Sequence, residues 1–147
     1  MIIVAVSGGF DPIHVGHLRS IQQAGKLGDK LMVILTRDDQ LIQKKGYCFM
    51  PYEERKEILE GLHGVDIVVP NVDAGITSNE SLEYYHPGIF AKGGDRTADN
   101  MPDIEKAICD RIGCRIVYGV GGGKIQSSSW LVKKSTEPNN EVLASTL

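Results

Sequence analysis

Two histidines stand close together near the start of the chain, just after a short apolar run and a pair of glycines. His14 and His17 are three residues apart, so they are neighbours on one face if a helix begins there. Gly16 between them keeps that face open, while Gly8 and Gly9 lack the Cβ atom that would hold a backbone amide away from a phosphate. A helix start also offers free N–H groups and partial positive charge. Two imidazoles aimed at one phosphate would stabilise the charge of phosphoryl transfer; the plainer alternative is a turn with two surface histidines.

A second glycine-rich segment lies near the other end of the chain and reads Gly121-Gly122-Gly123-Lys124-Ile125-Gln126-Ser127-Ser128-Ser129-Trp130. Ser127 can cap a following helix, and Ser128 and Ser129 can bind phosphate oxygens together with free backbone amides. A flexible loop with an ordinary serine cap would have the same composition. The segment is therefore a second candidate phosphate site, supported by the presence of the first.

Two further polar groups could complete such a site. Lys44 and Lys45 lie in a predicted long loop, Arg37–Met50. They could contact a phosphate, or they could simply be a solvated charge pair. Asp95, which follows two glycines in Lys92-Gly93-Gly94-Asp95-Arg96, could bond a ribose hydroxyl or cap a turn. The residues alone leave these alternatives open.

Alternating strands and helices must position these residues. Short runs rich in valine and isoleucine predict buried strands, and the stretches between them predict helices, which together indicate an α/β fold with an open, mostly parallel sheet. Ligands of such sheets lie beyond the carboxyl ends of the strands, so we expect the site in the loops after the first, second, fourth and fifth strands. The predicted strands are Ile2–Val6, Lys30–Thr36, Val65–Val69, Ile89–Ala91 and Arg115–Tyr118, and the predicted helices are Val15–Leu27, Pro51–Leu62, Asn79–Tyr85, Pro102–Arg111 and Ser128–Lys133.

The composition is that of an ordinary globular domain. The chain has 147 residues, of which 41% are hydrophobic and 24% charged, and its net charge is −3. We expect one domain over residues 1–134, a polar tail over residues 135–147 and no nucleic-acid surface. No apolar run approaches the roughly 18 residues of a membrane span, and the apolar start without a basic leader predicts no signal peptide. The odd number of cysteines, three, without metal-type spacing indicates reduced residues of a cytoplasmic protein.

The segment from His14 to His17 resembles the HxGH signature of the cytidylyltransferase-like nucleotidyltransferases, and the resemblance extends over about residues 1–134. It implies a Rossmann-like three-layer α/β/α fold of the HUP, or nucleotidylyl transferase, type with a five-stranded sheet. It also implies that both histidines and one of Lys44 and Lys45 are catalytic, and that Arg55 and Asp11 contact the acceptor, although Arg55 could equally be a structural ion-pair residue. The nucleotide-binding residues that it implies are Gly8, Gly9, Phe10, Asp11, Gly16, Lys92, Gly94, Asp95, Arg96, Gly119, Gln126, Ser127, Ser128 and Ser129.

The segment Lys92-Gly93-Gly94-Asp95 narrows the resemblance to the heptose-1-phosphate adenylyltransferase domains of lipopolysaccharide-core biosynthesis. It implies transfer of AMP from ATP, or of CMP from CTP, to a sugar phosphate with release of pyrophosphate. Asp-Pro-Ile-His in the first loop is closer to the pantetheine-phosphate and nicotinamide-nucleotide adenylyltransferases, and Gln-Ser-Ser-Ser replaces the Gly-Ser-Thr-Thr of many sugar enzymes. A glycerol-3-phosphate-type cytidylyltransferase and a cofactor-forming adenylyltransferase, for example of the FAD type, therefore stay open.

Few carboxylates fall in the predicted loops, so we expect Mg²⁺ to arrive on the nucleotide and no protein side chain to bind metal. The resemblance implies a homodimer. Two alternatives come from other classes of protein: a nucleotide-binding regulator without catalysis, and a metal-binding protein that uses His14, His17, His63 and His86.

Overall fold

The computed structural model describes residues 1–93, 96–123 and 126–136 of the chain. Within this part a five-stranded sheet has the order β3-β2-β1-β4-β5, and all its strand pairs are parallel. The strands are β1 (Ile3–Gly8), β2 (Lys30–Leu35), β3 (Ile67–Pro70), β4 (Ile89–Gly93) and β5 (Arg115–Val120). The helices are α1 (Val15–Ala24), α2 (Asp38–Lys45), α3 (Tyr52–Glu60), α4 (Asn79–Tyr85), α5 (Asp103–Ile112) and α6 (Ser128–Thr136), and a short 3-10 helix, η1 (Gly25–Leu27), follows α1. The predicted α/β fold is confirmed.

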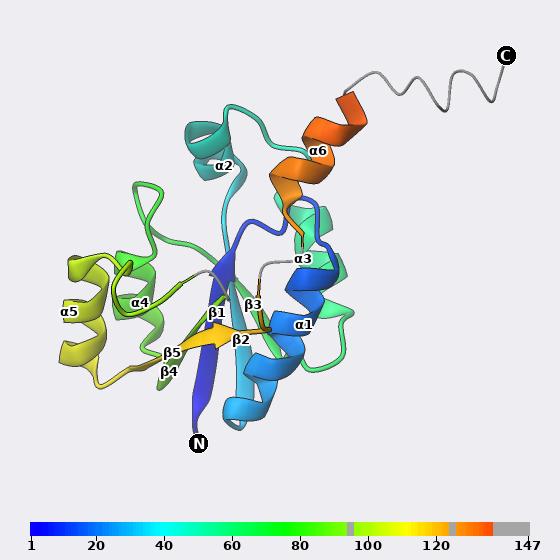
Figure 1. Cartoon of the computed structure of the whole chain (residues 1–147). Coiled ribbons are helices and arrows are strands. Elements are labelled where there is room, and N and C mark those ends of the chain that lie inside the picture. Colours follow the sequence, from blue (N-terminus) through cyan, green and yellow to red (C-terminus); the bar gives the residue numbers. More distant parts are fainter. Residues whose placement is uncertain (94–95, 124–125, 137–147) are drawn as a thin grey trace, which may run out of the picture.

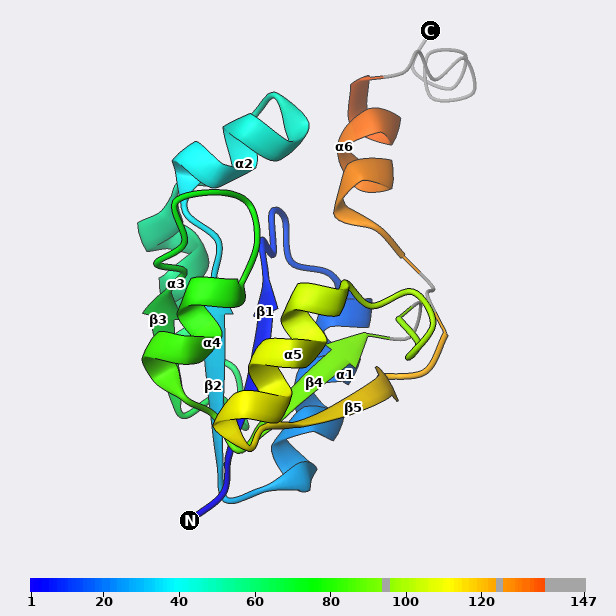
Figure 2. The ribbon, with the colours of Figure 1, turned by 90° about the vertical axis from the view of Figure 1, so that its left-hand side faces the viewer.

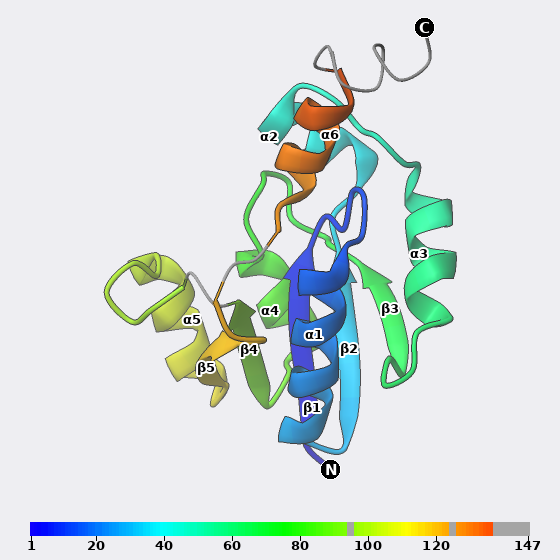
Figure 3. The ribbon, with the colours of Figure 1, turned by 45° about the vertical axis from the view of Figure 1, so that its right-hand side comes forward.

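The three layers explain why the central strands are continuous apolar runs rather than alternating ones. Helices α1 and α3 cover one face of the sheet, and α4 and α5 cover the other (Figures 1, 2 and 3). Val4 and Val6 of β1 pack toward the first face, and Ala5 between them packs toward the second. A strand that is buried on both faces must be apolar at every position, as in β2, where Leu31 to Leu35 are all buried.

The course of the chain places a crevice beside β1. From β1 the chain proceeds to β2 and β3 on one side of the sheet, and then crosses to β4 and β5 on the other. Loops that leave the carboxyl ends of β1 and β4 therefore diverge to opposite sides and leave a space between them. Helices α2 and α6 lie beyond these carboxyl ends, on either side of the first loop (Figures 1 and 2).

Helix α2 corrects the predicted loop Arg37–Met50, because residues 38–45 are helical. The helix is short and polar, and only Gln40 and Leu41 are buried, so it has no apolar periodicity that would indicate it. The signals it does carry lie at its ends. Asp38 and Asp39 are in its first turn, two lysines are in its last turn, and Gly46 ends it with a φ of 86°.

At the carboxyl end, α6 continues to Thr136, two residues past the predicted end of the domain, and residues 137–147 of the predicted tail lie outside the described residues. None of the helices in the described ranges combines the length and the apolar character that crossing a membrane would require.

Candidate active site

A cleft of about 710 Å³ lies over the carboxyl ends of the strands. Segments far apart in the sequence form its walls: the loop after β1, helix α2, the loop after β3, the end of β4 and the start of α6. Predicted site residues that line it are Gly8, Gly9, Phe10, Asp11, His17, Lys44, Lys45, Lys92, Arg96, Ser127, Ser128 and Ser129. The fold therefore brings the two candidate phosphate segments, which are more than 100 residues apart, to one cavity.

The two histidines form the amino-terminal cap of α1. His14 is the N-cap residue, and its Nδ1 accepts from the backbone N–H of Gly16 at 3.1 Å and of His17 at 3.4 Å. In return, Nδ1 of His17 accepts from the backbone N–H of His14 at 3.2 Å. The imidazole rings are stacked with centroids 3.7 Å apart, and the Phe10 ring lies 4.6 Å from that of His17. The reciprocal cap holds both rings in fixed orientations at the start of the helix.

This cap also decides which nitrogen carries the proton. Because both Nδ1 atoms accept hydrogen bonds, each neutral ring has its proton on Nε2. Burial, the neighbouring His14 and the charge of Lys45 together lower the pKa of His17 to about 3. At neutral pH His17 therefore faces the cleft as an uncharged Nε2–H donor, not as a cation.

The two lysines differ in their surroundings. Lys45 is half-buried; its Nζ donates to the backbone oxygen of Asp11 at 3.4 Å and lies 5.1 Å from the centre of the Tyr47 ring. Lys44 lines the cleft as well but is exposed. Lys45 is thus the lysine whose charge acts on His17, which the sequence left undecided.

The serine run begins α6 beside the first loop. Ser127 caps the helix by accepting from the N–H of Trp130 at 3.5 Å, and Ser128 Oγ donates to the backbone oxygen of Pro12 at 2.7 Å. The second bond links the start of α6 to the turn that precedes the histidines. The amino-terminal ends of α1 and α6 therefore border the same cleft. The histidine cap occupies N–H groups at the start of α1, so the first turn of α6, at Ser128 and Ser129, is the helix start that can donate backbone N–H groups to anionic oxygens.

Two predicted acceptor contacts have internal partners instead. The side chain of Asp11 is buried, and its two oxygens accept from the N–H groups of Phe49 at 2.7 Å and Met50 at 2.5 Å. Arg55 is also buried and does not line the cleft. Its guanidinium donates to the backbone oxygens of Met50, Gly9 and Thr36 and to the carboxylate of Asp38. Both residues hold the segment between α2 and α3 against the first loop.

Other predicted residues lie beside the cleft or outside the described part. The lining does not include His14, Gly16, Gly119 or Gln126. Gly94 and Asp95 lie outside the described residues. In the ranges that the structure covers, no group of three or more His, Cys, Asp or Glu side chains is placed to hold a metal ion.

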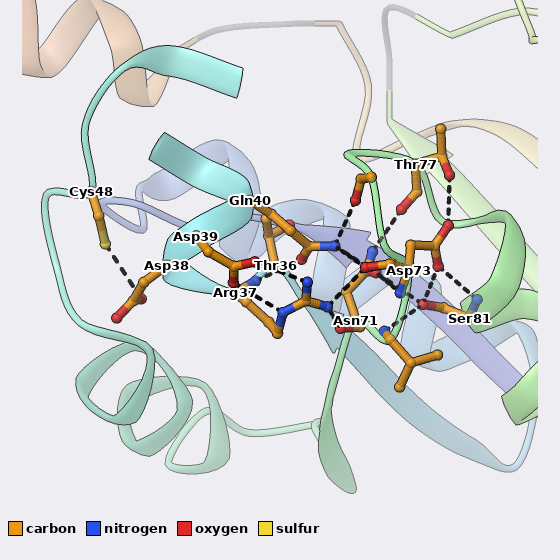
Figure 4. A network of polar contacts seen from close by, with 12 residues as sticks. Thr36, Arg37, Asp38, Asp39, Gln40, Cys48, Asn71, Asp73, Thr77 and Ser81 are labelled. Carbon is orange, nitrogen blue, oxygen red and sulfur yellow. Dashed lines mark hydrogen bonds and ion pairs between the residues drawn. The ribbon is translucent and has the colours of Figure 1, made fainter. Parts of the chain in front are cut away.

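The loop after β3 is a part of the site that the sequence reasoning missed. Asn71 and the segment 76–79 line the cleft. From the sequence, the site was expected only in the loops after the first, second, fourth and fifth strands. Figure 4 shows how a polar network holds this loop on α2. The buried Gln40 donates to Asn71 Oδ1 at 3.0 Å and to the backbone oxygens of Asp73 and Gly75 at 3.1 and 2.8 Å.

Two buried side chains complete the network from the side of α4. Asp73 accepts from the backbone N–H and the hydroxyl of Ser81 at 2.8 and 2.7 Å, and from the hydroxyl of Thr77 at 2.6 Å. The loop therefore joins α2 to α4 and becomes a wall of the cleft. The available signal was the position of Asn71, a polar residue directly after a strand.

Comparison with known proteins connects this arrangement to a family. The profile of the family described as Cytidylyltransferase-like matches residues 5–118 of the chain. The bifunctional protein HldE of Hahella chejuensis is 37% identical over 122 residues, which are 82% of this chain and 23% of that protein. The FAD synthase of Pyrococcus abyssi is 37% identical over 99 residues, 67% of this chain and 66% of that one. The glycerol-3-phosphate cytidylyltransferase of Staphylococcus aureus is 31% identical over 125 residues, 84% of this chain and 91% of that one.

A solved structure supports the fold. The lipopolysaccharide core biosynthesis protein from Thermoplasma volcanium superposes with a TM-score of 0.67 at 22% identity, over 81% of this chain and 94% of the other. The Rossmann-like nucleotidylyl transferase fold expected from the sequence is thereby confirmed. The names of these relatives do not agree on one substrate, and the chain spans only 23% of HldE and 66% of the FAD synthase.

Proposed function

The chain belongs to the cytidylyltransferase-like family, and on that premise we propose that it is a nucleotidyltransferase. It transfers a nucleoside monophosphate from a nucleoside triphosphate to a phosphorylated small molecule and releases pyrophosphate. The observation that carries the proposal is the meeting of His17, Lys45 and the first turn of α6 in one cleft. These groups supply a neutral donor, a cation and a helix amino terminus, and phosphoryl transfer requires such positioning and electrostatic stabilisation rather than a covalent nucleophile.

The proposed reaction is a single in-line displacement. An oxygen of the acceptor phosphate forms a bond to the α-phosphorus, and the bond from that phosphorus to the bridging oxygen breaks, so that pyrophosphate leaves with the electron pair. Nε2–H of His17 and the ammonium of Lys45 stabilise the charge on the α-phosphate oxygens. Ser127, Ser128 and Ser129, with their helix start, hold the leaving pyrophosphate. His14 acts as a positioning residue, because its Nδ1 caps the turn that orients His17.

Mg²⁺ fits this site as a companion of the nucleotide. The buried carboxylates of the cleft, Asp11 and Glu105, already have protein partners, so phosphate oxygens would hold the ion. When bound, it would neutralise part of the triphosphate charge.

ATP is the proposed nucleotide and a sugar phosphate such as heptose 1-phosphate the proposed acceptor, on the resemblance carried by the segment from Lys92. The lining supports a hydrophilic acceptor: Asn71, Thr77, Ser78 and Asn79 offer amides and hydroxyls, and Phe10 is the only aromatic residue among the described lining residues. Because Phe10 packs on His17, it does not offer the flat aromatic wall that would suit a flavin.

A second candidate is cytidylyl transfer to glycerol 3-phosphate. The observation that favours it is the match to the cytidylyltransferase of S. aureus, which covers 91% of that protein. We also propose that the protein forms a homodimer, on the family resemblance. A cytoplasmic location is proposed from the three cysteines, all of which are free thiols.

Pyrophosphate release tests these proposals directly. The purified protein is incubated with Mg²⁺ and either ATP or CTP, against heptose 1-phosphate, glycerol 3-phosphate, phosphopantetheine, nicotinamide mononucleotide and FMN. Release that requires one nucleotide and one acceptor would establish the reaction and both substrates. If nucleotide binds but no acceptor supports release, a binding protein without catalysis would account for the data better.

A further inference from the structure

A buried ion pair lies in the cleft and has no part in the proposed transfer. Lys92 Nζ is 3.2 Å from Glu105 Oε1, and the side chains are only 16% and 10% exposed. Both residues line the cleft. Lys92 comes from the end of β4, and Glu105 from the first turn of α5. The family resemblance implied that Lys92 binds the nucleotide, and no role was assigned to Glu105 from the sequence.

The pair lies on the opposite side of the sheet from the histidines. Lys92 Nζ is 4.5 Å from the centre of the Phe90 ring, which packs in the core under α4 and α5. His17 lies in the first turn of α1, which covers the other face of the sheet, as Figures 2 and 3 show for these helices. The cleft thus runs across the top of the sheet, from the starts of α1 and α6 to the start of α5.

The geometry of in-line displacement determines which end of the cleft the acceptor occupies. The attacking and leaving oxygens must lie on opposite sides of the α-phosphorus. If pyrophosphate leaves at the starts of α1 and α6, the acceptor approaches from the side of α4 and α5. Lys92, Glu105 and the loop segment 76–79 line that side.

The charges of the pair restrict which part of the acceptor can lie there. A phosphate group beside the Glu105 carboxylate would be repelled, and Lys92 is already paired with that carboxylate. A hydroxyl group both donates and accepts, so it can donate to a carboxylate oxygen and accept from an ammonium hydrogen. Neighbouring hydroxyls of a polyol or sugar match this arrangement, whereas an apolar or flat aromatic group would cover the ion pair and displace water from it without adding a hydrogen bond.

We infer that Glu105, oriented by Lys92, is a specificity-determining residue that accepts hydrogen bonds from the hydroxyl groups of a polyhydroxylated acceptor. The phosphate of the same acceptor points toward Lys45 and His17. This inference rests on the proposed nucleotidyl transfer, because the side from which the acceptor approaches follows from that reaction. It adds which part of the acceptor, its hydroxyl groups, the protein recognises.

Calorimetric binding to the whole chain tests the inference without requiring turnover. The nucleotide site is first filled with a non-reacting ATP or CTP analogue that has a methylene bridge between the α- and β-phosphorus atoms. Heptose 1-phosphate, glycerol 3-phosphate, the 2-deoxy analogue of glycerol 3-phosphate and FMN are then titrated. The proteins are the wild type, Glu105→Gln and the control Glu83→Gln, which removes a carboxylate from an exposed ion pair with Arg111.

We expect a polyol phosphate to bind the wild type and the control alike, and to bind Glu105→Gln about 10- to 100-fold more weakly, as loss of a hydrogen bond to a charged group predicts. The analogue itself should bind all three proteins equally. The 2-deoxy acceptor should bind the wild type more weakly and should lose less in Glu105→Gln, because the hydroxyl that Glu105 would bind is already missing.

Four results would overturn the inference: equal acceptor binding by wild type and Glu105→Gln, equal weakening of the nucleotide analogue, the same loss in Glu83→Gln, or binding of FMN and of no polyol phosphate. Circular dichroism and the melting temperature of each variant separate a local loss from unfolding. Acceptor binding that depends on Glu105, without pyrophosphate release from any substrate pair, would support this inference and refute nucleotidyl transfer.

Discussion

Replacing His17 with asparagine would separate two tasks that its ring performs. Nδ1 accepts from the backbone N–H of His14 and caps α1, which leaves Nε2–H as the donor of a ring that lines the cleft. The shorter asparagine amide can take the place of Nδ1 but does not reach the position of Nε2. Losing a donor to the developing charge costs about 2.7–4 kcal/mol of transition-state stabilisation, so kcat should fall about 10²- to 10³-fold. The free energy of unfolding should change by less than about 1 kcal/mol, because the cap remains.

The converse variant, His17→Gln, is the matched control. Its longer side chain places an amide N–H near the position of Nε2 and leaves the backbone N–H of His14 without its partner. It should retain more activity than His17→Asn but lose about 1 kcal/mol of stability. Steady-state pyrophosphate release and urea unfolding measure the two quantities. Wild-type turnover by His17→Asn, or equal loss of activity in both variants, would refute the assignment of the two nitrogens.

Three further predictions concern charge and the polar network. Because the folded protein holds the pKa of His17 at about 3 while the unfolded chain has the ordinary 6.5, only the unfolded state takes up this proton between those two pH values. This difference therefore costs nothing above pH 6.5 and destabilises the folded state increasingly as the pH falls, by about 3 kcal/mol at pH 4.5. Urea unfolding of His17→Asn, measured at pH 4.5 and above pH 6.5, should lack that part of the loss. Gln40→Leu should cost about 1–3 kcal/mol, since the backbone oxygen of Gly75 loses its donor while Asn71 and Asp73 keep others, and should raise the KM of the acceptor more than that of the nucleotide; an unchanged acceptor KM would contradict the role given to the loop after β3. Lys45→Met should raise the pKa of His17, measurable by NMR titration, and slow pyrophosphate release more than Lys44→Met does; equal effects of the two variants would count against the assignment of Lys45.

The sequence identified the sheet and most of its helices because burial leaves a local pattern along the chain. Each of the five strands overlaps a predicted apolar run, and α4 has the predicted bounds Asn79–Tyr85. Helix α2 was missed for the same physical reason, since only Gln40 and Leu41 of its eight residues are buried. Its terminal charges and Gly46 were visible in the sequence but are weaker signals than an apolar face.

The site was predicted best where its residues are adjacent in sequence. The spacing of His14 and His17 after two glycines determined that both belong to the start of one helix, and the serine run marked the start of another. Their types also indicated phosphate chemistry. The different tasks of the two histidines did not follow, because the tautomers depend on which backbone N–H groups each Nδ1 meets.

Only the tertiary structure decided which polar residues face the cleft. Arg55 has the residue type of a ligand contact, yet it lies outside the lining and its guanidinium donates to oxygens of other segments. The carboxylate of Asp11 lies at the cleft but is held by two backbone N–H groups. Conversely, Asn71 and Glu105 reach the cleft from a loop and a helix that carry no phosphate-binding pattern. Periodicity and spacing report contacts within about one helical turn or between alternate strand residues, whereas a cleft wall is assembled from segments whose proximity is set by strand order and helix packing.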